Sequence, residues 1–222
     1  MSDDDFSPFY ALPKQDVLGA ADVLLVELGM ESHRYVSPLP VFRALGAPFE
    51  VVTDPACDGN LYYHHGRWCV RVRHSRDTRV FERRLAHESG HFAQLLFGVR
   101  PPHHEVSTNL VGLCVRIPAR GLSRVIQRTG GDPLAVVEAY PEAYPSEVLV
   151  RLGLHLGGAT ILLRKNLLPA NDGQLEIPFE FQAKAKEALR TGLVVADGQG
   201  LIAVPFRDPG CSRGVALVIS GS

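Results

Sequence analysis

Hydrophobic residues recur at helical spacing over much of the chain, and glycine, proline or polar turns end each such stretch. The resulting stripes predict helices at residues 14–29, 39–45, 79–97, 105–115 and 121–128, followed by one from Asp132 and one from Ser146. The start at Asp132 is well defined, because aspartate suits the N-cap and Pro133 suits the first helical position. The long helix at 79–97 is amphipathic, so one of its faces is expected to be buried.

Alternating hydrophobic and polar residues interrupt this helical pattern upstream of the long helix. Residues 49–53 predict a short strand, and residues 60–64 and 67–73 predict a hairpin that turns at His65-Gly66. The second hairpin strand alternates apolar residues with arginine and cysteine, so one face of the hairpin is expected to pack on a core.

The pattern changes near residue 170, where a helix at 179–191 is followed by short strands separated by Asp-Gly and Pro-Gly pairs. We therefore predict an α+β protein. Residues 1–169 are expected to form a mostly helical domain with a small sheet, and residues 170–222 a small C-terminal α+β subdomain whose role the pattern does not indicate.

The composition is that of an ordinary globular protein, with 45% hydrophobic residues, 21% charged residues and a formal net charge of -1 over 222 residues. This balance excludes a disordered or coiled-coil chain and gives no overall attraction to nucleic acids or membranes. The four cysteines lie far apart with no C-x-x-C pair, which argues against a structural zinc knot. An acidic N-terminus and the lack of an 18-residue apolar run predict a cytoplasmic protein.

The chemistry of the chain is expected on the helix at 79–97, which contains the H-E-x-x-H motif His87-Glu88-Ser89-Gly90-His91. Residues four apart lie on one face of a helix, so both imidazoles can reach one metal ion. Glu88, one position further round, can accept a proton from water that attacks a peptide carbonyl. The alternative is a surface helix with two solvated histidines.

A third ligand must come from beyond the motif. The metzincin pattern would need glycine three residues and histidine six residues after His91, where this chain has glutamine and phenylalanine. Thermolysin-like enzymes take a glutamate from a following helix, and the first acidic residue after Pro101-Pro102 is Glu105. The neighbouring His103 and His104 are alternatives, either as ligands or as donors to the oxyanion.

Three other features of the sequence bear on function. Tyr63 and His65 lie on the predicted hairpin and are candidate substrate or oxyanion contacts, with packing as the alternative. The arginine-rich stretch at 71–84 is interpreted as a solvated face, with substrate docking as its alternative. The helices from Asp132 and Ser146 carry few cations, so no direct contact with nucleic acid is expected.

Three segments together resemble the ImmA/IrrE family of metallopeptidases: Leu85-Ala86-His87-Glu88-Ser89-Gly90-His91, then Glu105-Val106-Ser107-Thr108-Asn109, then Ile117-Pro118. The family pattern is an Ala-His-Glu-x-Gly-His helix, followed by Glu-x-x-Ala-Asn and a downstream proline. The likeness extends over roughly residues 17–165. This chain departs from the pattern at Ser89, where the family has an apolar residue, and at Thr108, where it has alanine.

The resemblance implies a zincin-like domain in which His87, His91 and Glu105 bind zinc and Glu88 is the catalytic base. Asn109, one helical turn after Glu105, would be a neighbour of the metal site. Members of this family cleave a partner transcriptional repressor and thereby switch on mobile-element or DNA-damage genes, so a role in transcription regulation under stress is implied.

The sequence thus predicts a zinc-dependent endopeptidase acting on a protein substrate, with manganese as an alternative metal because such a site binds several divalent ions. A second hypothesis is a regulatory protein that inactivates a repressor by binding it, with a structural or vestigial metal site. Hydrolysis of a small amide or peptide is a third.

Overall fold

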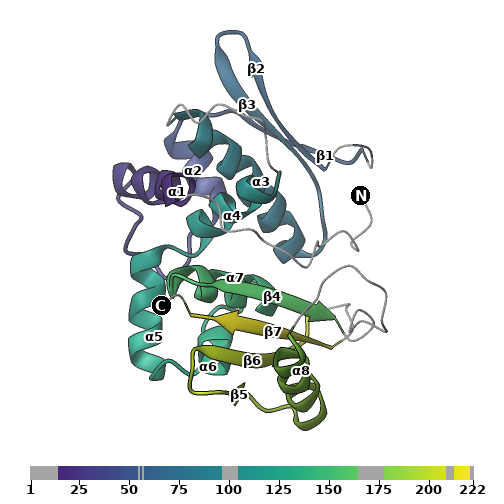
Figure 1. The fold of residues 1–222 in the computed structure, drawn as a ribbon. Coiled ribbons are helices and arrows are strands. Elements are labelled where there is room, and N and C mark those ends of the chain that lie inside the picture. The colour runs from purple at the N-terminus through teal and green to yellow at the C-terminus, as the bar shows by residue number, and fades with distance from the viewer. Residues whose placement is uncertain are drawn as a thin grey trace. The chain divides into compact units, whose positions relative to one another are not determined.

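The computed structural model describes residues 15–54, 56, 58–96, 105–164, 178–208 and 213–220. The chain forms two compact units, an N-terminal unit of residues 13–127 and a C-terminal unit that begins at residue 128 (Figure 1). Both contain helices and a small sheet, so the protein is α+β as the sequence predicts. No helix in the described part of the chain is long and apolar enough to span a membrane.

The helices of the N-terminal unit are α1 (Gln15–Glu27), α2 (Pro38–Ala44), α3 (Thr78–Leu96), α4 (Glu105–Arg116) and α5 (Ala119–Thr129). Its strands are β1 (Phe49–Val52), β2 (Gly59–His64) and β3 (Arg67–Arg73). They lie in the order β1-β3-β2, with β3 parallel to β1 and antiparallel to β2. The predicted helices and strands of this unit are confirmed, and their observed bounds differ from the predicted ones by about two residues at most.

The hairpin of β2 and β3 turns at His65 and Gly66, where φ is 48° and 80°. Two consecutive residues with positive φ match the right-handed twist of the strands, and glycine adopts this conformation without strain. The predicted hairpin and its turn are therefore confirmed.

One face of the three-stranded sheet packs against α2 and α3. Buried side chains from each element meet there, namely Phe42, Val70, Val72, Leu85 and Phe92. Each contributes about 1.5–3 kcal/mol by leaving water. The rings of Phe42 and Phe92 meet edge to face with centroids 6.5 Å apart. This core holds the buried face of α3 against the sheet, which orients the rest of the helix.

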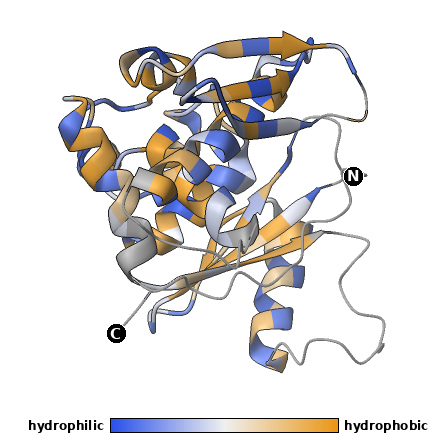
Figure 2. Cartoon of the chain, turned by 90° about the horizontal axis from the view of Figure 1, so that it is seen from above, coloured by the Kyte–Doolittle hydropathy of each residue, from blue (hydrophilic) through white to orange (hydrophobic). Residues whose placement is uncertain are grey.

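The C-terminal unit contains α6 (Pro133–Glu138), α7 (Pro145–His155), β4 (Ala159–Arg164), α8 (Phe179–Thr191), β5 (Val195–Ala196), β6 (Leu201–Phe206) and β7 (Gly214–Ile219). The strands form an antiparallel sheet in the order β4-β7-β6-β5. Successive residues of β7 face opposite sides: Val215 and Leu217 pack with α8, whereas Ala216 and Val218 pack with α7. Helix α8 carries hydrophobic and hydrophilic residues in turn (Figure 2), and its small Ala185 and Ala188 are buried.

Strand β4 is not among the elements predicted from the sequence. Ile161 packs with the cluster on one face of the sheet and Leu162 with the cluster on the other, so the strand lacks the alternation that marks a half-buried strand. β4 pairs with β7 along its whole length, from Ala159 opposite Ile219 onward. The C-terminal sheet therefore uses residues on both sides of the predicted boundary at 169/170, and the compact unit itself begins at residue 128.

Asp208 fastens the end of β6 to the first turn of α7. Its carboxylate accepts hydrogen bonds from the Ser146 backbone N–H at 3.1 Å and from the Ser146 hydroxyl at 2.5 Å. Asp208 is only 8% exposed, so water cannot fully replace it as a partner of the helix end.

Replacing Asp208 by alanine is expected to lower the free energy of unfolding by about 2 kcal/mol, because it leaves a buried donor without an acceptor. Urea unfolding followed by circular dichroism measures the effect. Glu147→Ala is the matched control, since the Glu147 carboxylate caps the same helix by accepting the Tyr144 N–H but is only partly buried. Equal losses in the two variants would contradict a special role for Asp208.

Candidate metal and catalytic site

Helix α3 places the two histidines of the motif side by side. The imidazole centroids of His87 and His91 are 4.7 Å apart and the ring planes are nearly perpendicular, at 88°. Both side chains are partly exposed. Four-residue spacing on a regular helix thus brings two imidazoles together on an accessible face, as the sequence predicts.

The ring of His87 is held by α4. Its Nδ1 lies 2.9 Å from Oδ1 of Asn109. An amide oxygen accepts hydrogen bonds, so in the tautomer that uses this contact Nδ1 donates, and Nε2 is the ring nitrogen that Asn109 does not engage. Such an outer partner fixes the tautomer and direction of a ligand histidine in metal sites. The position of Asn109 next to the motif agrees with what the family resemblance implies.

Glu88 lies on a different side of α3 from the histidine pair. Only 2% of Glu88 is exposed, and its side chain approaches the beginning of β2 at Gly59. The motif therefore combines two accessible imidazoles with a buried carboxyl group on the adjacent residue.

Two glycines let α3 and α4 approach until their backbones touch (Figure 1). A Cβ on Gly90 would lie 3.0 Å from the backbone nitrogen of Gly112 and closer still to the carbonyl oxygen of Thr108. A Cβ on Gly112 would lie 2.6 Å from the carbonyl carbon of Ala86. This close crossing brings Asn109 within reach of His87.

The two departures from the family pattern lie buried in the same region. Ser89 donates its hydroxyl proton to the Ala86 carbonyl at 2.7 Å, and Thr108 donates to Oε1 of Gln94 at 3.0 Å. Because each hydroxyl has a hydrogen-bond partner, burial of these polar residues does not carry the cost of an unsatisfied group.

Replacing Gly112 by alanine is expected to destabilise the N-terminal unit by about 1–3 kcal/mol, because the new methyl group meets backbone atoms that cannot move aside. Thermal unfolding followed by circular dichroism measures the loss. Gly19→Ala is a matched helix-interior control, since nothing lies within 4 Å of a Cβ there. That substitution should stabilise the protein slightly, by up to about 1 kcal/mol. A Gly112→Ala variant as stable as Gly19→Ala would contradict the close crossing.

The candidates for a third metal ligand lie outside the side chains that the structure describes. Glu105 is the first residue of α4, but its side chain is outside the described part, as are residues His103 and His104 altogether. Among the side chains that are described, no three His, Cys, Asp or Glu residues gather closely enough to hold a metal ion. The assignment of Glu105 remains a prediction.

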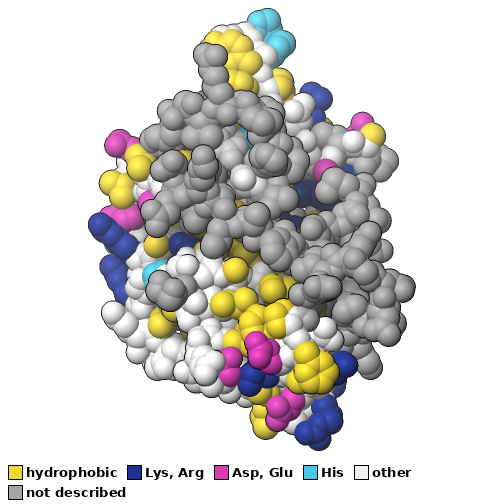
Figure 3. Space-filling view, in the orientation of Figure 1, with side chains coloured by type: hydrophobic (Ala, Val, Ile, Leu, Met, Phe, Trp, Pro, Cys, Tyr) yellow, Lys and Arg dark blue, Asp and Glu magenta, His cyan; other side chains and the backbone are white. Residues whose placement is uncertain are grey.

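Tyr63 and His65 occupy the free end of the hairpin, where histidine side chains are exposed (Figure 3). Tyr63 is 62% exposed and packs edge to face on Trp68 at 5.3 Å, while the His65 ring lies 3.9 Å from that of His64. Tyr63 lies four residue steps, about 13 Å, along β2 from Gly59, the residue of β2 that meets Glu88. A role for Tyr63 or His65 in substrate contact remains a prediction.

Gly59 is a site residue that the sequence analysis did not identify. A glycine inside a strand often marks a close approach of other atoms, but this signal does not say which atoms approach. The contact with Glu88 joins residues 29 positions apart and could be seen only in the folded chain.

The donor set suits a zinc ion as far as it is described. Two imidazoles with ring centroids 4.7 Å apart could share one tetrahedral cation, and Nε2 is the nitrogen of His87 that Asn109 does not engage. A comparison with protein-family models and with curated proteins finds no match for this chain. Any function assigned to it therefore rests on the residues of the site.

Proposed function

We propose that the chain is a zinc-dependent endopeptidase that hydrolyses a peptide bond in a protein substrate, with manganese as an alternative metal. One observation carries the proposal: His87 and His91 stand side by side on α3, and Asn109 holds the first of them by a 2.9 Å hydrogen bond. The hydrogen bond lies at the surface, and the buried crossing of α3 and α4 at Gly90 and Gly112 fixes the distance between its two residues.

In this proposal His87 and His91 hold the metal, and Glu105 is the expected third ligand. A zinc ion bound there would supply a Lewis acid and lower the pKa of water to about 7. A hydrogen bond donated by Nδ1 of His87 to Asn109 would leave Nε2 as the nitrogen for the metal. Loss of this hydrogen bond would let the imidazole rotate and change tautomer.

Glu88 is the proposed general base and acid. Its carboxylate takes the proton of the attacking water and returns it to the departing amine, so that the reaction needs only one proton-transferring side chain. Its 2% exposure supports this role, because a carboxylate shielded from bulk water interacts more strongly with charge that develops beside it.

The proposed substrate is a transcriptional repressor, and this step depends on the resemblance to the ImmA/IrrE family. Cleavage of such a partner would place the protein in transcription regulation under stress. We propose neither a nucleic acid nor a membrane as partner.

The proposal is tested by offering the zinc-loaded protein a proteome-derived peptide library and identifying new N-termini by mass spectrometry. We expect a consistent set of cleaved bonds that disappears with a chelator and in the Glu88→Gln variant. An unchanged library would overturn the peptidase proposal. If a repressor partner then formed a stable complex and stayed intact, with or without Glu88, the binding-only regulator would be the better account.

A further inference from the structure

We propose that Gly59 and Asp58, at the start of β2, are positioning residues that seat the carboxyl group of Glu88. This inference rests on the proposed function, because the two residues have this role only if Glu88 is the general base. Gly59 supplies the space, and Asp58 fastens the strand to α3.

The space at Gly59 is filled by Glu88. A Cβ built on Gly59 would lie 3.1 Å from Cδ and 3.4 Å from Cγ of Glu88, and closer still to its Oε1. The φ angle of Gly59 is not in the left-handed region, so its backbone conformation does not by itself require glycine. The need for glycine here comes from the neighbouring carboxyl group.

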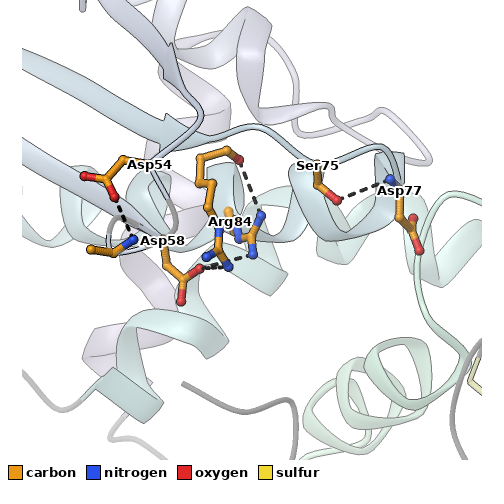
Figure 4. A network of polar contacts seen from close by, with 7 residues as sticks. Asp54, Asp58, Ser75, Asp77 and Arg84 are labelled. Atoms are coloured by element: carbon orange, nitrogen blue, oxygen red, sulfur yellow. Dashed lines mark hydrogen bonds and ion pairs between the residues drawn. The ribbon is translucent and has the colours of Figure 1, made fainter.

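Asp58 joins the start of β2 to two other elements (Figure 4). Its Oδ1 forms ion pairs with Arg73 of β3 and, at 3.1 Å, with Nη2 of Arg84 on α3. Arg84 also donates to the carbonyl oxygen of Arg73 at 3.4 Å, and the Arg73 N–H donates to the carbonyl oxygen of Asp58 at 3.1 Å. These contacts close a ring through β2, β3 and α3.

The contacts among Asp58, Arg73 and Arg84 lie close to Glu88 in the sequence and in space. Arg84 is four residues before Glu88, one turn earlier on the same helix, and Asp58 directly precedes Gly59. The ion pair between Asp58 and Arg84 therefore fixes where the start of β2 lies along the axis of α3, which is beside Glu88. We call Gly59 and Asp58, with their contacts to α3, the seat of Glu88. These contacts restrict the carboxylate to a narrow set of positions, which proton transfer requires.

His87 is held by a different element from the one that contacts Glu88. His87 is oriented by Asn109 of α4, whereas Glu88 meets β2. A methyl group at position 59 is therefore expected to displace the carboxyl group and to leave the two imidazoles where they are. This separation allows the seat to be tested apart from metal binding.

The first test compares Gly59→Ala with Gly19→Ala, a control with open space around the new methyl group. With the peptide found in the library screen, Gly59→Ala should lower kcat by about 10- to 100-fold with KM and zinc content unchanged. In a Glu88→Asp background, whose shorter side chain leaves room for the methyl group, the same substitution should lower kcat less than about twofold further. An equal loss of kcat in the Glu88 and the Glu88→Asp backgrounds would overturn the proposal that Gly59 positions the Glu88 carboxyl group.

A second measurement does not need activity. In the metal-free protein, Gly59→Ala should lower Tm, and this shift should vanish when Glu88→Asp is also present. If Gly59→Ala lowers Tm equally in both backgrounds, the proposed contact between Gly59 and Glu88 is excluded, whatever the activity. If instead the wild type binds no zinc and cleaves nothing, the peptidase proposal fails, and the catalytic role of the seat fails with it.

The contribution of Asp58 is tested with Asp58→Asn. Its carboxylate is 45% exposed, so we expect a smaller loss of kcat, about two- to fivefold, again without a change in KM. Asp54→Asn is the control from the same loop, because that carboxylate accepts a local hydrogen bond from the Ala56 N–H at 2.9 Å. Equal kcat values for the two variants would overturn the role given to Asp58.

Discussion

Replacing Glu88 by glutamine is expected to abolish peptide hydrolysis while zinc binding stays intact. Glutamine has almost the same shape as glutamate and fits the same space beside Gly59, but its amide cannot accept the proton of the attacking water. Loss of a general base costs about 10²–10⁴-fold in rate. We expect the loss of kcat to lie within this range.

The measurement compares cleavage rate and zinc content of Glu88→Gln with those of the wild type. Glu50→Gln is a matched control, since Glu50 lies on β1, is exposed and pairs with Arg71 at the surface. A Glu88→Gln variant that cleaves at the wild-type rate would show that another group accepts the proton. A variant that loses zinc as well would show that Glu88 has a structural part in the metal site.

Removing either motif histidine is expected to abolish zinc binding at micromolar metal. A site with three protein ligands loses one third of its donors in His87→Ala or His91→Ala, and the remaining groups compete poorly with water and buffer. Asn109→Ala should have an intermediate effect, about 10–100-fold weaker binding, because the ligand remains but its orienting hydrogen bond to Nδ1 is lost.

Affinity is measured by competition with a chromogenic chelator, and metal content by elemental analysis. His64→Ala is the control, because His64 is an exposed histidine at the end of the hairpin. Retention of tight, equimolar zinc in both motif variants would exclude the proposed site. In the same assay, Glu105→Ala, His103→Ala and His104→Ala identify the third ligand, since only one of them should match the loss seen with His87→Ala.

Local patterns along the chain were sufficient to predict most helices and the first hairpin. The amphipathic stripe of α3 and the turn at His65-Gly66 depend on neighbours a few residues apart, and such interactions act within any segment that can reach a core. The same locality explains why the pairing of His87 with His91 followed from spacing alone. Strand β4 was missed because burial of both its faces removes the alternation that a sequence displays.

Contacts between distant segments required the tertiary structure. The sequence by itself determined the helix that carries His87, Glu88 and His91, because helical periodicity and motif spacing are properties of one segment. The family resemblance implied that Asn109 lies near the site, but only the folded chain showed that its Oδ1 meets Nδ1 of His87 and that Gly59 makes room for Glu88. Both contacts depend on the register in which two elements pack. That register depends on the shapes of all the buried side chains together, and these side chains come from many segments of the chain.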